Sequence, residues 1–261
     1  MSQSSNPKLF VHAGTHKTGT TAIQRFLKAN RQALARKGIG VVGLNSEERK
    51  YIKALAEEIG NGDSKNIDIR YSPIISSINR CQQKMARKLD GYIISWEGFS
   101  GADNIGYIDA KNYAQLLGMH SGHYGVQAII YFRRQDNFIE SMYTQRVKQG
   151  YTGMLGDYLN SVPEGGFDWL TLIHSYEEAL GKDNVVAKRY GKMHLPTRDS
   201  ILKDIIEFLG INHNHIDFSA GSNRGIISNP GWPKDVVELT RELNTHIARE
   251  QRKSNIKGIE K

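Results

Sequence analysis

The sequence predicts an α/β fold in which helices flank a central parallel sheet. Three observations lead to this prediction. Short apolar runs alternate with segments whose apolar residues follow a helical spacing. A loop rich in glycine and threonine joins the first apolar run to the first helical segment. The 261 residues are enough for one sizeable α/β domain that folds without disulfides.

Five short apolar runs are typical of buried parallel strands. In chain order they are residues 9–11, 39–43, 91–96, 126–132 and 184–190. Because helical segments separate these runs, we expect right-handed crossovers between parallel strands. In such sheets, ligands bind beyond the carboxyl ends of the strands.

The helical segments are marked by apolar spacing and by residues that start or stop a helix. The expected helices are residues 21–37, a segment around Phe138 and Met142, residues 199–209 and a last segment that starts near Pro233. Gly38 and Gly210 follow two of them and suit the position just past a helix end. Proline suits the first turn of the last helix.

Residues 46–90 differ from the rest of the chain because they are polar. We expect them to be mostly helical, with breaks at residues 60–63 and 72–73. They are the part least like a core, and we expect a substrate-facing insertion there. Residues 8–254 are expected to form one domain, between a disordered N-terminus at residues 1–7 and a frayed tail at residues 255–261.

The composition favours a cytoplasmic protein. The single cysteine, Cys81, can form neither an internal disulfide nor a zinc site, which favours a reducing compartment. We find no signal peptide and no apolar run long enough for a membrane span, so neither is expected.

The formal net charge is +8. One interpretation is a positive field that attracts an anionic ligand or an acidic polymer, and the other is a basic surface that is simply solvated. The sequence has no zinc finger, no aromatic-rich RNA-binding motif and no long basic tail. Nucleic acid is therefore not the expected partner.

The loop at residues 12–21 is typical of a phosphate or sulfate site at a helix N-terminus. Gly14 and Gly19 have the separation of the nucleotide P-loop, but Thr20 stands where that motif has lysine. The lysine, Lys17, lies inside the loop instead. We expect the backbone N–H groups of residues 18–21, the threonine hydroxyls and the Lys17 ammonium to surround an anion.

The strand at residues 126–132 runs directly into Arg133. A nucleotide hydrolase of the P-loop type carries a metal-binding acid at the end of a strand. Arginine at this point argues against a magnesium nucleotide and suits a second phosphate site without metal. We therefore expect no metal, and we expect Lys17, Glu97 and Arg133 to share one crevice.

These two elements together resemble the sulfotransferases that use 3′-phosphoadenosine 5′-phosphosulfate (PAPS). Residues 15–21 resemble their 5′-phosphosulfate loop. Arg133 at a strand end and Ser141 eight residues later resemble their 3′-phosphate site. Residues 185–190 and 222–228 are similar to bacterial members, and Glu97 is similar to the base of carbohydrate-type members. The resemblance covers most of residues 8–245, is weakest over residues 40–90, and implies the three-layer sandwich of P-loop NTPases.

The resemblance implies a role for each residue of the PAPS site. Lys17 would contact the oxygen that bridges phosphate and sulfate and would neutralise the leaving group. Arg133 and Ser141 would hold the 3′-phosphate, and Arg224 would be a further phosphate contact. The 5′-phosphate would be held by Thr18, Gly19, Thr20 and Thr21. PAPS would act as co-substrate without metal.

The general base is expected near the end of the third strand, within hydrogen-bond reach of the acceptor. Glu97 is the candidate, and His12 or His16 could take its place. His16 could also touch the acceptor or the sulfuryl group. Trp96 and Phe99 could line the acceptor pocket or belong to the core, and His12 could be a hydrogen-bonded core residue.

The sequence thus predicts transfer of a sulfuryl group from PAPS to a hydroxyl or amine of a glycan or other hydroxylated metabolite. Two alternatives stay open at this point. One is a P-loop kinase or NTPase that binds ATP with Mg²⁺. The other is a non-catalytic module that binds an anion or a carbohydrate on the same fold. No motif identifies the acceptor or an oligomeric state.

Overall fold

The computed structural model describes residues 6–191, 198–219 and 232–247. The chain divides into two compact units, which are described in turn. The first comprises Met1–Phe132 and Gly165–Ser222, and the second comprises Arg133–Glu164 and Asn223–Lys261. The tail expected at residues 255–261 and all but two of the N-terminal residues 1–7 lie outside the described residues.

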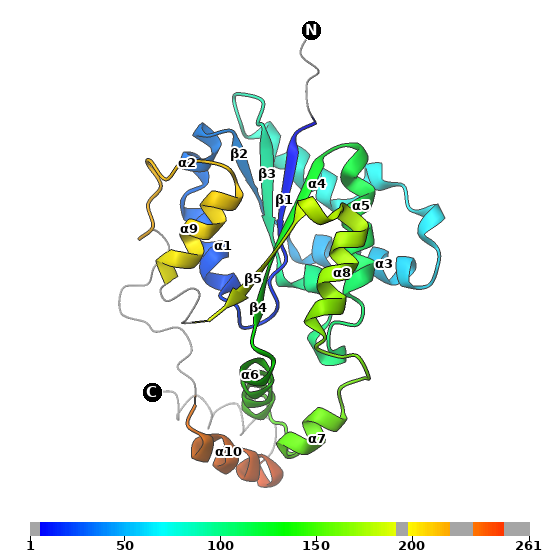
Figure 1. The fold of residues 1–261 in the computed structure, drawn as a ribbon, viewed down its shortest axis with the longest axis vertical. Coiled ribbons are helices and arrows are strands. Elements are labelled where there is room, and N and C mark those ends of the chain that lie inside the picture. Colours follow the sequence, from blue (N-terminus) through cyan, green and yellow to red (C-terminus); the bar gives the residue numbers. More distant parts are fainter. Residues whose placement is uncertain (1–5, 192–197, 220–231, 248–261) are drawn as a thin grey trace. The chain divides into compact units, whose positions relative to one another are not determined.

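Within the described residues, five strands form one sheet in the order β2-β3-β1-β4-β5. The strands are β1 (Lys8–His12), β2 (Ile39–Val42), β3 (Gly91–Ser95), β4 (Gly125–Arg133) and β5 (Val185–Tyr190). Parallel pairing joins β2 to β3, β3 to β1 and β1 to β4, and β5 runs alongside β4 in the same direction (Figure 1). The predicted α/β fold with a central parallel sheet is confirmed.

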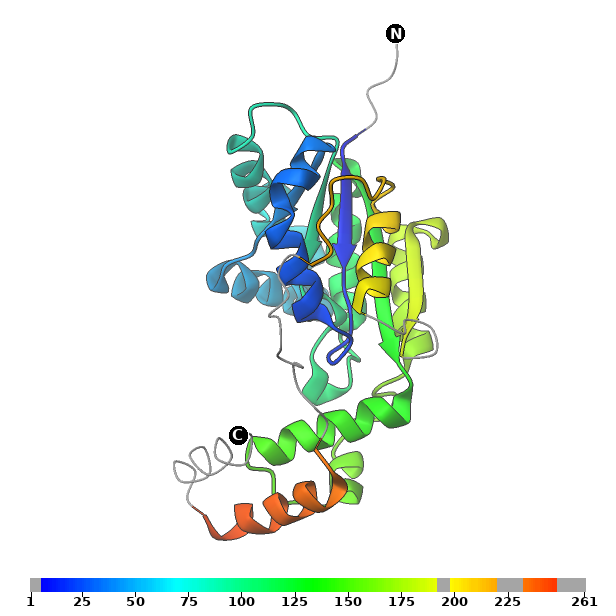
Figure 2. The same ribbon diagram turned by 90° about the vertical axis from the view of Figure 1, so that its left-hand side faces the viewer.

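Helices cover both faces of the sheet, which gives three layers (Figure 1). One face carries α1 (Thr20–Ala29), α2 (Arg31–Arg36) and α9 (Arg198–Phe208). The other carries α3 (Ser46–Gly60), α4 (Pro73–Gln83), α5 (Ala110–Gly118) and α8 (Trp169–Leu180). Figure 2 looks onto the face that carries α1 and α9, in front of the strands of the sheet.

Short 3₁₀ helices occupy several of the connections. They are η1 (Ser64–Asn66), η2 (Ile69–Tyr71), η3 (Glu97–Ser100), η4 (Asp103–Ile105), η5 (Met119–Gly122) and η6 (Lys182–Asn184). Of these, η3 directly follows β3 and places Glu97 at the carboxyl edge of the sheet.

Successive side chains along each strand point to opposite faces of the sheet. Phe10, Ile93 and Ile129 face α1 and α9. They pack there with Ile23, Phe26, Leu27, Ile201, Leu202 and Ile205 in one buried core. This core anchors α1 against β1, so the loop between these two elements starts and ends on a rigid support.

Asn30 interrupts the helix expected over residues 21–37, and that expectation is wrong at this point. α1 ends before Asn30 and α2 begins after it. The buried Asn30 amide donates to the Asp217 carbonyl and accepts from the Asp217 N–H, each over 2.9 Å. The break at Asn30 could not be predicted from the helical spacing of apolar residues, because it depends on a contact with a residue far away in the chain. Gly38 does follow the helical region, with a φ of 85°.

Residues 46–90 contribute more to the core than their polar composition suggests. A capping box between Asn45 and Glu48 starts α3, with hydrogen bonds of 2.8 and 2.9 Å. The buried side chains of α3 and α4 include Ile52, Leu55, Ile59, Ile74 and Ile78. The breaks expected at residues 60–63 and 72–73 are confirmed as the end of α3 and the start of α4.

The described part of the second unit is mostly helical. Its helices within the described residues are α6 (Gln135–Lys148), α7 (Leu155–Asn160) and α10 (Lys234–His246), which confirms the helices expected around Phe138 and after Pro233. The Asn244 amide of α10 donates to the carbonyls of Val147 (2.8 Å) and Tyr151 (3.1 Å). The Lys148 ammonium lies 4.0 Å from the centre of the Trp232 ring.

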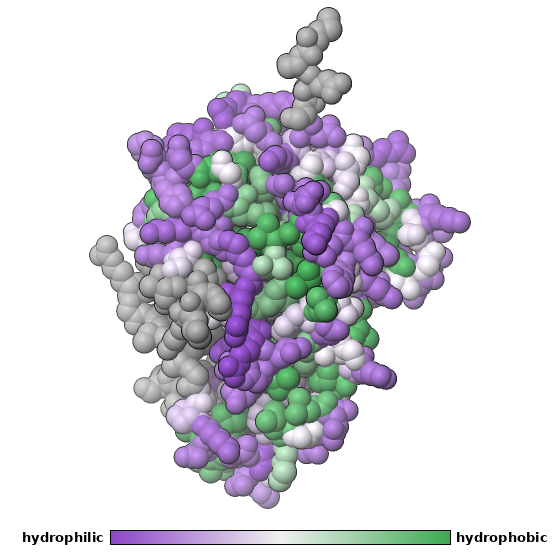
Figure 3. Space-filling model, in the orientation of Figure 1, coloured by the Kyte–Doolittle hydropathy of each residue, from purple (hydrophilic) through white to green (hydrophobic). Residues whose placement is uncertain are grey.

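The surface is hydrophilic over most of the face drawn in Figure 3, with hydrophobic side chains in smaller areas between the charged ones. A composition with 24% charged residues accounts for this pattern. Across the residues that the structure describes, no helix combines the length and the apolar character that crossing a membrane requires.

Candidate functional site

The glycine- and threonine-rich loop lies between β1 and α1, at the carboxyl edge of the sheet. β4 is longer than β1, and the chain continues to pair with it beyond the end of β1. The Ala13 N–H donates to the Ile129 carbonyl (3.1 Å). The Thr15 N–H and hydroxyl both donate to the Tyr131 carbonyl, over 3.3 and 3.2 Å. The loop is therefore held on β4 before it turns into α1.

Two residues in the left-handed region shape the turn into α1. Lys17 has a φ of 67° and Gly19 a φ of 81°. Glycine adopts this conformation freely, whereas for lysine a strained backbone costs on the order of 1–3 kcal/mol. Between them, the fully buried Thr18 donates its hydroxyl to the Thr15 carbonyl. Strain held at Lys17 by the surrounding structure is typical of a ligand-binding position.

The N-terminus of α1 presents unused hydrogen-bond donors. Gly19 is the N-cap and has no side chain, and the first turn carries no acid. The backbone N–H groups of residues 18–21 donate to no group in the described part of the chain. The Thr20 hydroxyl is buried and also lacks a partner there. An anion would satisfy these donors and interact favourably with the helix dipole, so the loop fits a phosphate or phosphosulfate group.

His12 is fully buried beneath the loop. Its Nδ1 shares a hydrogen bond with the Ser95 hydroxyl at 2.7 Å, and its Nε2 has no partner among the described atoms. A Cβ at Gly14 would approach that Nε2 to 2.9 Å, which explains glycine at this position. Burial lowers the pKa of His12 to about 3. His12 is therefore neutral near pH 7 and is poorly matched to a general base, which supports a role in holding the loop.

His16 is oriented by Tyr107, a residue that sequence reasoning missed. The Tyr107 hydroxyl accepts from the His16 N–H (3.1 Å) and lies 2.7 Å from His16 Nδ1. Tyr107 itself has a φ of 66° and is buried. Its ring packs near Phe167 and Trp169. With Nδ1 engaged, Nε2 is the ring nitrogen through which His16 can contact a ligand.

Glu97 is joined to α1 through Gln24, another residue that sequence reasoning missed. The Gln24 amide donates to Glu97 Oε2 (3.1 Å) and to the Ser95 carbonyl (3.2 Å). Gln24 lies one turn into the helix that begins at the loop, so the carboxylate lies alongside that helix. In the described parts of the chain, Glu97 forms no ion pair and its Oε1 accepts no hydrogen bond. This oxygen can accept a proton.

Trp96 and Phe99 are buried, with exposed fractions of 4% and 0%. Their rings meet edge to face at 5.1 Å, and Trp96 also contacts Tyr113 at 6.4 Å. They form the core beneath Glu97 and η3. Because both side chains are buried, the structure does not support the contact with an acceptor that the sequence suggested.

Tyr190 packs against the loop from the end of β5. A Cβ at Gly19 would lie 3.4 Å from the Tyr190 ring and 3.6 Å from its hydroxyl oxygen. The signal for this residue was present in the sequence, because Tyr190 stands at the carboxyl end of a strand, where ligands of such sheets bind.

The residues expected at the 3′-phosphate belong to the second unit. Arg133 is the last residue of β4, and Ser141 lies on α6; both are partly buried. The neighbouring Arg134 pairs with Asp136. Arg224 and the rest of residues 222–228 lie outside the described residues. The crevice shared by Lys17, Glu97 and Arg133 stays a prediction, because these residues belong to different units.

Over residues 6–191, 198–219 and 232–247, no three histidine, cysteine, aspartate or glutamate side chains gather in a way that could hold a metal ion.

Comparisons with known proteins bear on the fold. No protein-family model and no curated protein sequence matches the chain. Among solved structures, the chain is similar to a sulfotransferase from Alicyclobacillus acidocaldarius, with a TM-score of 0.51 and 13% identity over 97% of this chain and 96% of that one. A sulfotransferase domain from the curacin biosynthetic pathway aligns with a TM-score of 0.41 and 12% identity over 93% of this chain and 99% of that one. The first likeness shows that the chain has the fold of a solved sulfotransferase.

Proposed function

We propose that this protein is a sulfotransferase that uses PAPS. The observation that carries the proposal is the loop at residues 14–21, on a fold similar to that of a solved sulfotransferase. This loop combines an uncapped helix N-terminus, a buried Thr20 hydroxyl without a partner in the described residues, and a strained Lys17. All three features are accounted for by an anionic ligand that is bound at the end of α1.

Each residue of the site has a separate role in the proposed reaction. PAPS supplies an activated sulfuryl group, whose bond to the bridging phosphate oxygen breaks as a new bond to the acceptor forms. Lys17 neutralises the negative charge that develops on the leaving phosphate. The donors of residues 18–21 hold the 5′-phosphate, while Arg133, Ser141 and Arg224 bind the 3′-phosphate in this proposal.

Glu97 acts as the general base in this proposal. Gln24 holds Glu97 Oε2 by a hydrogen bond, which leaves Oε1 to take the proton of the acceptor hydroxyl or amine. The acceptor is a glycan or another hydroxylated metabolite, a choice supported by the glutamate at this position and by the basic net charge. A cytoplasmic setting is supported by the single cysteine.

Thermal unfolding with two nucleotides tests the proposal. The product nucleotide, 3′-phosphoadenosine 5′-phosphate, is expected to raise the melting temperature in the presence of a metal chelator. A ligand at a hundred times its Kd adds about 2.7 kcal/mol to the free energy of unfolding. ATP with Mg²⁺ is the comparison and is expected to add less. Stabilisation by ATP with Mg²⁺ alone would contradict the proposal and favour a kinase or NTPase.

Substitutions at Lys17 and Glu97 separate leaving-group stabilisation from proton transfer. Glu97→Gln is expected to lower turnover by about 100-fold or more and to retain affinity for the product nucleotide. Lys17→Ala is expected to lower both turnover and affinity, because its ammonium contacts the nucleotide. Glu47→Gln, on the exposed start of α3, is the matched control and keeps full activity. Full activity of Glu97→Gln would reject Glu97 as the base.

A further inference from the structure

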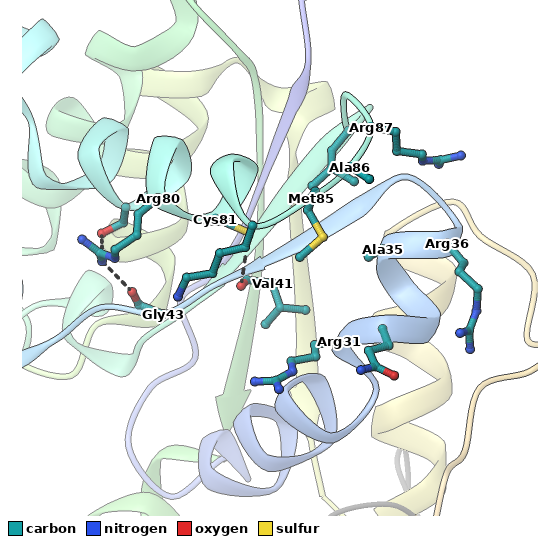
Figure 4. A pocket seen from close by; sticks show the side chains of 14 residues that line it. Arg31, Ala35, Arg36, Val41, Gly43, Arg80, Cys81, Met85, Ala86 and Arg87 are labelled. Carbon is teal, nitrogen blue, oxygen red and sulfur yellow. Dashed lines mark hydrogen bonds between the residues drawn. The ribbon is translucent and has the colours of Figure 1, made fainter.

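A cavity of about 840 Å³ opens beside β2, the edge strand of the sheet (Figure 4). Its walls come from α2, from the end of α4 and from the chain that follows α4. None of the residues that line it belongs to the loop at residues 14–21. Its volume falls within the range of small-molecule sites, about 300–1,000 Å³.

The cavity is lined by positive charge. Among the residues that the structure describes, the cationic side chains in its lining are Arg31, Arg36, Arg80, Lys84 and Arg87, and no carboxylate belongs to the lining. The two segments that build it, residues 31–43 and 77–89, contain no aspartate or glutamate at all. Arg80 is paired with Glu48 at 2.7 Å, outside the lining.

Helix ends account for only part of this charge. α2 and α4 both end here, with Arg36 and Arg80 in their last turns, and cations are favourable at such ends. Each helix end carries about half a negative charge. Glu48 and Asp90, whose carboxylate lies near Gly38 together with the Arg87 guanidinium, add two negative charges, so that about three of the five positive charges in the lining are offset. The remaining excess favours an anionic ligand.

The floor of the cavity is apolar. Val41, Cys81, Met85 and Leu89 line it, and Figure 4 shows the Val41 and Met85 side chains directed into the space between α2 and the chain after α4. In the same view Arg31 lies close to Val41, whereas Arg80 extends toward Gly43 and Arg36 lies on the outer side of α2. A ligand that fills the cavity would therefore contact apolar atoms with its body and cations with its charged group.

The backbone at this edge is already covered by side chains. Cys81 Sγ lies 3.6 Å from the Val41 carbonyl, and the Arg80 guanidinium donates to the Gly43 carbonyl over 3.4 Å. An extended acidic peptide could pair with β2 only by displacing these groups. Among the described residues, the lining has no aromatic ring and so offers no platform on which nucleic-acid bases could stack.

We propose that this cavity binds an anionic amphiphile, a molecule with an apolar body and a carboxylate, phosphate or sulfate head. The apolar body lies against Val41 and Met85, and the head group is bound by the surrounding arginine and lysine side chains. The site is separate from the phosphate loop, and the proposal does not depend on sulfuryl transfer.

Calorimetric titration of the full chain with three ten-carbon probes tests the charge requirement. Decanoate and decyltrimethylammonium below their critical micelle concentrations, and decanol below its solubility limit, share the same apolar chain. Decanoate is expected to bind at least about tenfold more tightly than the other two. Equal affinities, or no binding of decanoate, would overturn the proposal.

A pair of matched double variants tests the location. Arg31→Gln with Lys84→Gln removes two charges from the cavity, and Lys53→Gln with Lys111→Gln removes two from exposed positions on α3 and α5. The first pair is expected to weaken decanoate binding about tenfold or more, and the second to leave it nearly unchanged. Equal weakening by both pairs would place binding outside the cavity. Far-UV circular dichroism and the melting temperature should stay close to those of the wild type in both pairs, which shows that both fold.

Sedimentation with vesicles distinguishes the two sources of such a ligand. If vesicles containing phosphatidylglycerol bind the wild type but not Arg31→Gln with Lys84→Gln, the cavity takes lipid from a membrane. If decanoate binds and the vesicles do not, the cavity takes a free amphiphile. If decanoate does not bind, the proposal is overturned whatever the vesicles do, and the proposed function at residues 14–21 is unaffected.

Discussion

Thr18 and Thr20 stand two positions apart in the loop at residues 14–21, yet their hydroxyls are used differently. The Thr18 hydroxyl is buried and donates to the Thr15 carbonyl. The Thr20 hydroxyl is buried and meets no partner in the described residues. A buried hydroxyl that lacks a partner costs about 1–3 kcal/mol, which a bound anion would recover. Thr18 therefore holds the loop, and Thr20 is available for a ligand.

Valine substitutions at these two positions should separate stability from binding. Thr20→Val is expected to leave the free energy of unfolding unchanged or higher by about 1 kcal/mol, because it removes an unpaired hydroxyl. It should also weaken 3′-phosphoadenosine 5′-phosphate binding about tenfold, since one donor is lost. Thr18→Val, the matched control, should lower the free energy of unfolding by about 1–3 kcal/mol. Denaturant titration and calorimetry give the two quantities, and equal effects of both substitutions would contradict these roles.

The loop residues predicted from the sequence belong to one contiguous segment. The residues that were missed have roles that depend on contacts with residues far away in the chain. Lys17, Thr20 and their neighbours could be predicted because glycines, threonines and a lysine occur together between a strand and a helix. Tyr107 and Gln24 were missed because their roles arise from contacts with His16 and Glu97, which lie 91 and 73 positions away in the chain. A pattern in one segment carries no information about such a contact.

At the scale of elements, His120 joins η5 to the start of α4. Its Nδ1–H donates to the Leu116 carbonyl (2.9 Å), and its Nε2 accepts from the Ser72 hydroxyl (3.0 Å). Ser72 is the N-cap of α4 and accepts from the Ile74 N–H (3.2 Å). In this arrangement the imidazole is neutral, with Nε2 as the acceptor, which is the form that burial favours.

The folded protein should lose stability as the pH falls below neutrality. Burial lowers the pKa of His120 to about 4 and that of His12 to about 3. In the unfolded chain, both side chains titrate near the ordinary value of about 6.5, so the unfolded chain binds more protons between these values. Stability is then fully present above about pH 6.5 and is lost as the pH falls towards the folded values. From pH 7 to pH 5 the expected loss is about 2 kcal/mol for each histidine.

Denaturant titration at pH 7 and pH 5 measures this loss. His120→Gln is expected to show a loss that is smaller than that of the wild type by about 2 kcal/mol, because one buried histidine no longer titrates. His174→Gln, at an exposed position on α8, is the matched control. The same pH dependence in both variants would contradict the assignment to His120.

The elements differ in how well the sequence predicts them. All the expected strands were found, because a buried parallel strand is a short apolar run wherever it occurs. α5 and α8 were not anticipated. α8 contains tryptophan, threonine and isoleucine, which have modest helix propensity, and it depends on Asp168, whose side chain accepts from the N–H groups of Leu170 and Thr171. Tertiary packing and capping outweigh propensity there.

At the scale of the whole molecule, the charge of +8 should speed the arrival of an anionic nucleotide. The Debye length shrinks from about 10 Å at 0.1 M salt to about 3 Å at 1 M, so the attraction fades with added salt. We expect the association rate constant of 3′-phosphoadenosine 5′-phosphate to fall about tenfold over this range. Stopped-flow measurements provide this constant, and a value independent of salt would show that the net charge does not guide binding.

The fold could be predicted as a whole because its determinants repeat along the chain. Each strand carries its own pattern, as do several of the helices, and right-handed crossovers leave few ways to assemble them. The cavity beside β2 could not be predicted in this way. Its charges come from residues 31–43 and 77–89, and nothing in either segment indicates that the other lies opposite.

The attachment of the loop to β4 has a consequence for the order of folding. The loop is only a few residues long, yet the Thr15 hydroxyl binds a carbonyl 116 positions further along the chain. Contacts between such distant residues form slowly, because a long intervening chain must first be closed. A peptide that contained only β1, the loop and α1 would lack this support. Nucleotide affinity should therefore emerge late in refolding, when β1 and β4 have paired, and not when the helix at the loop first forms.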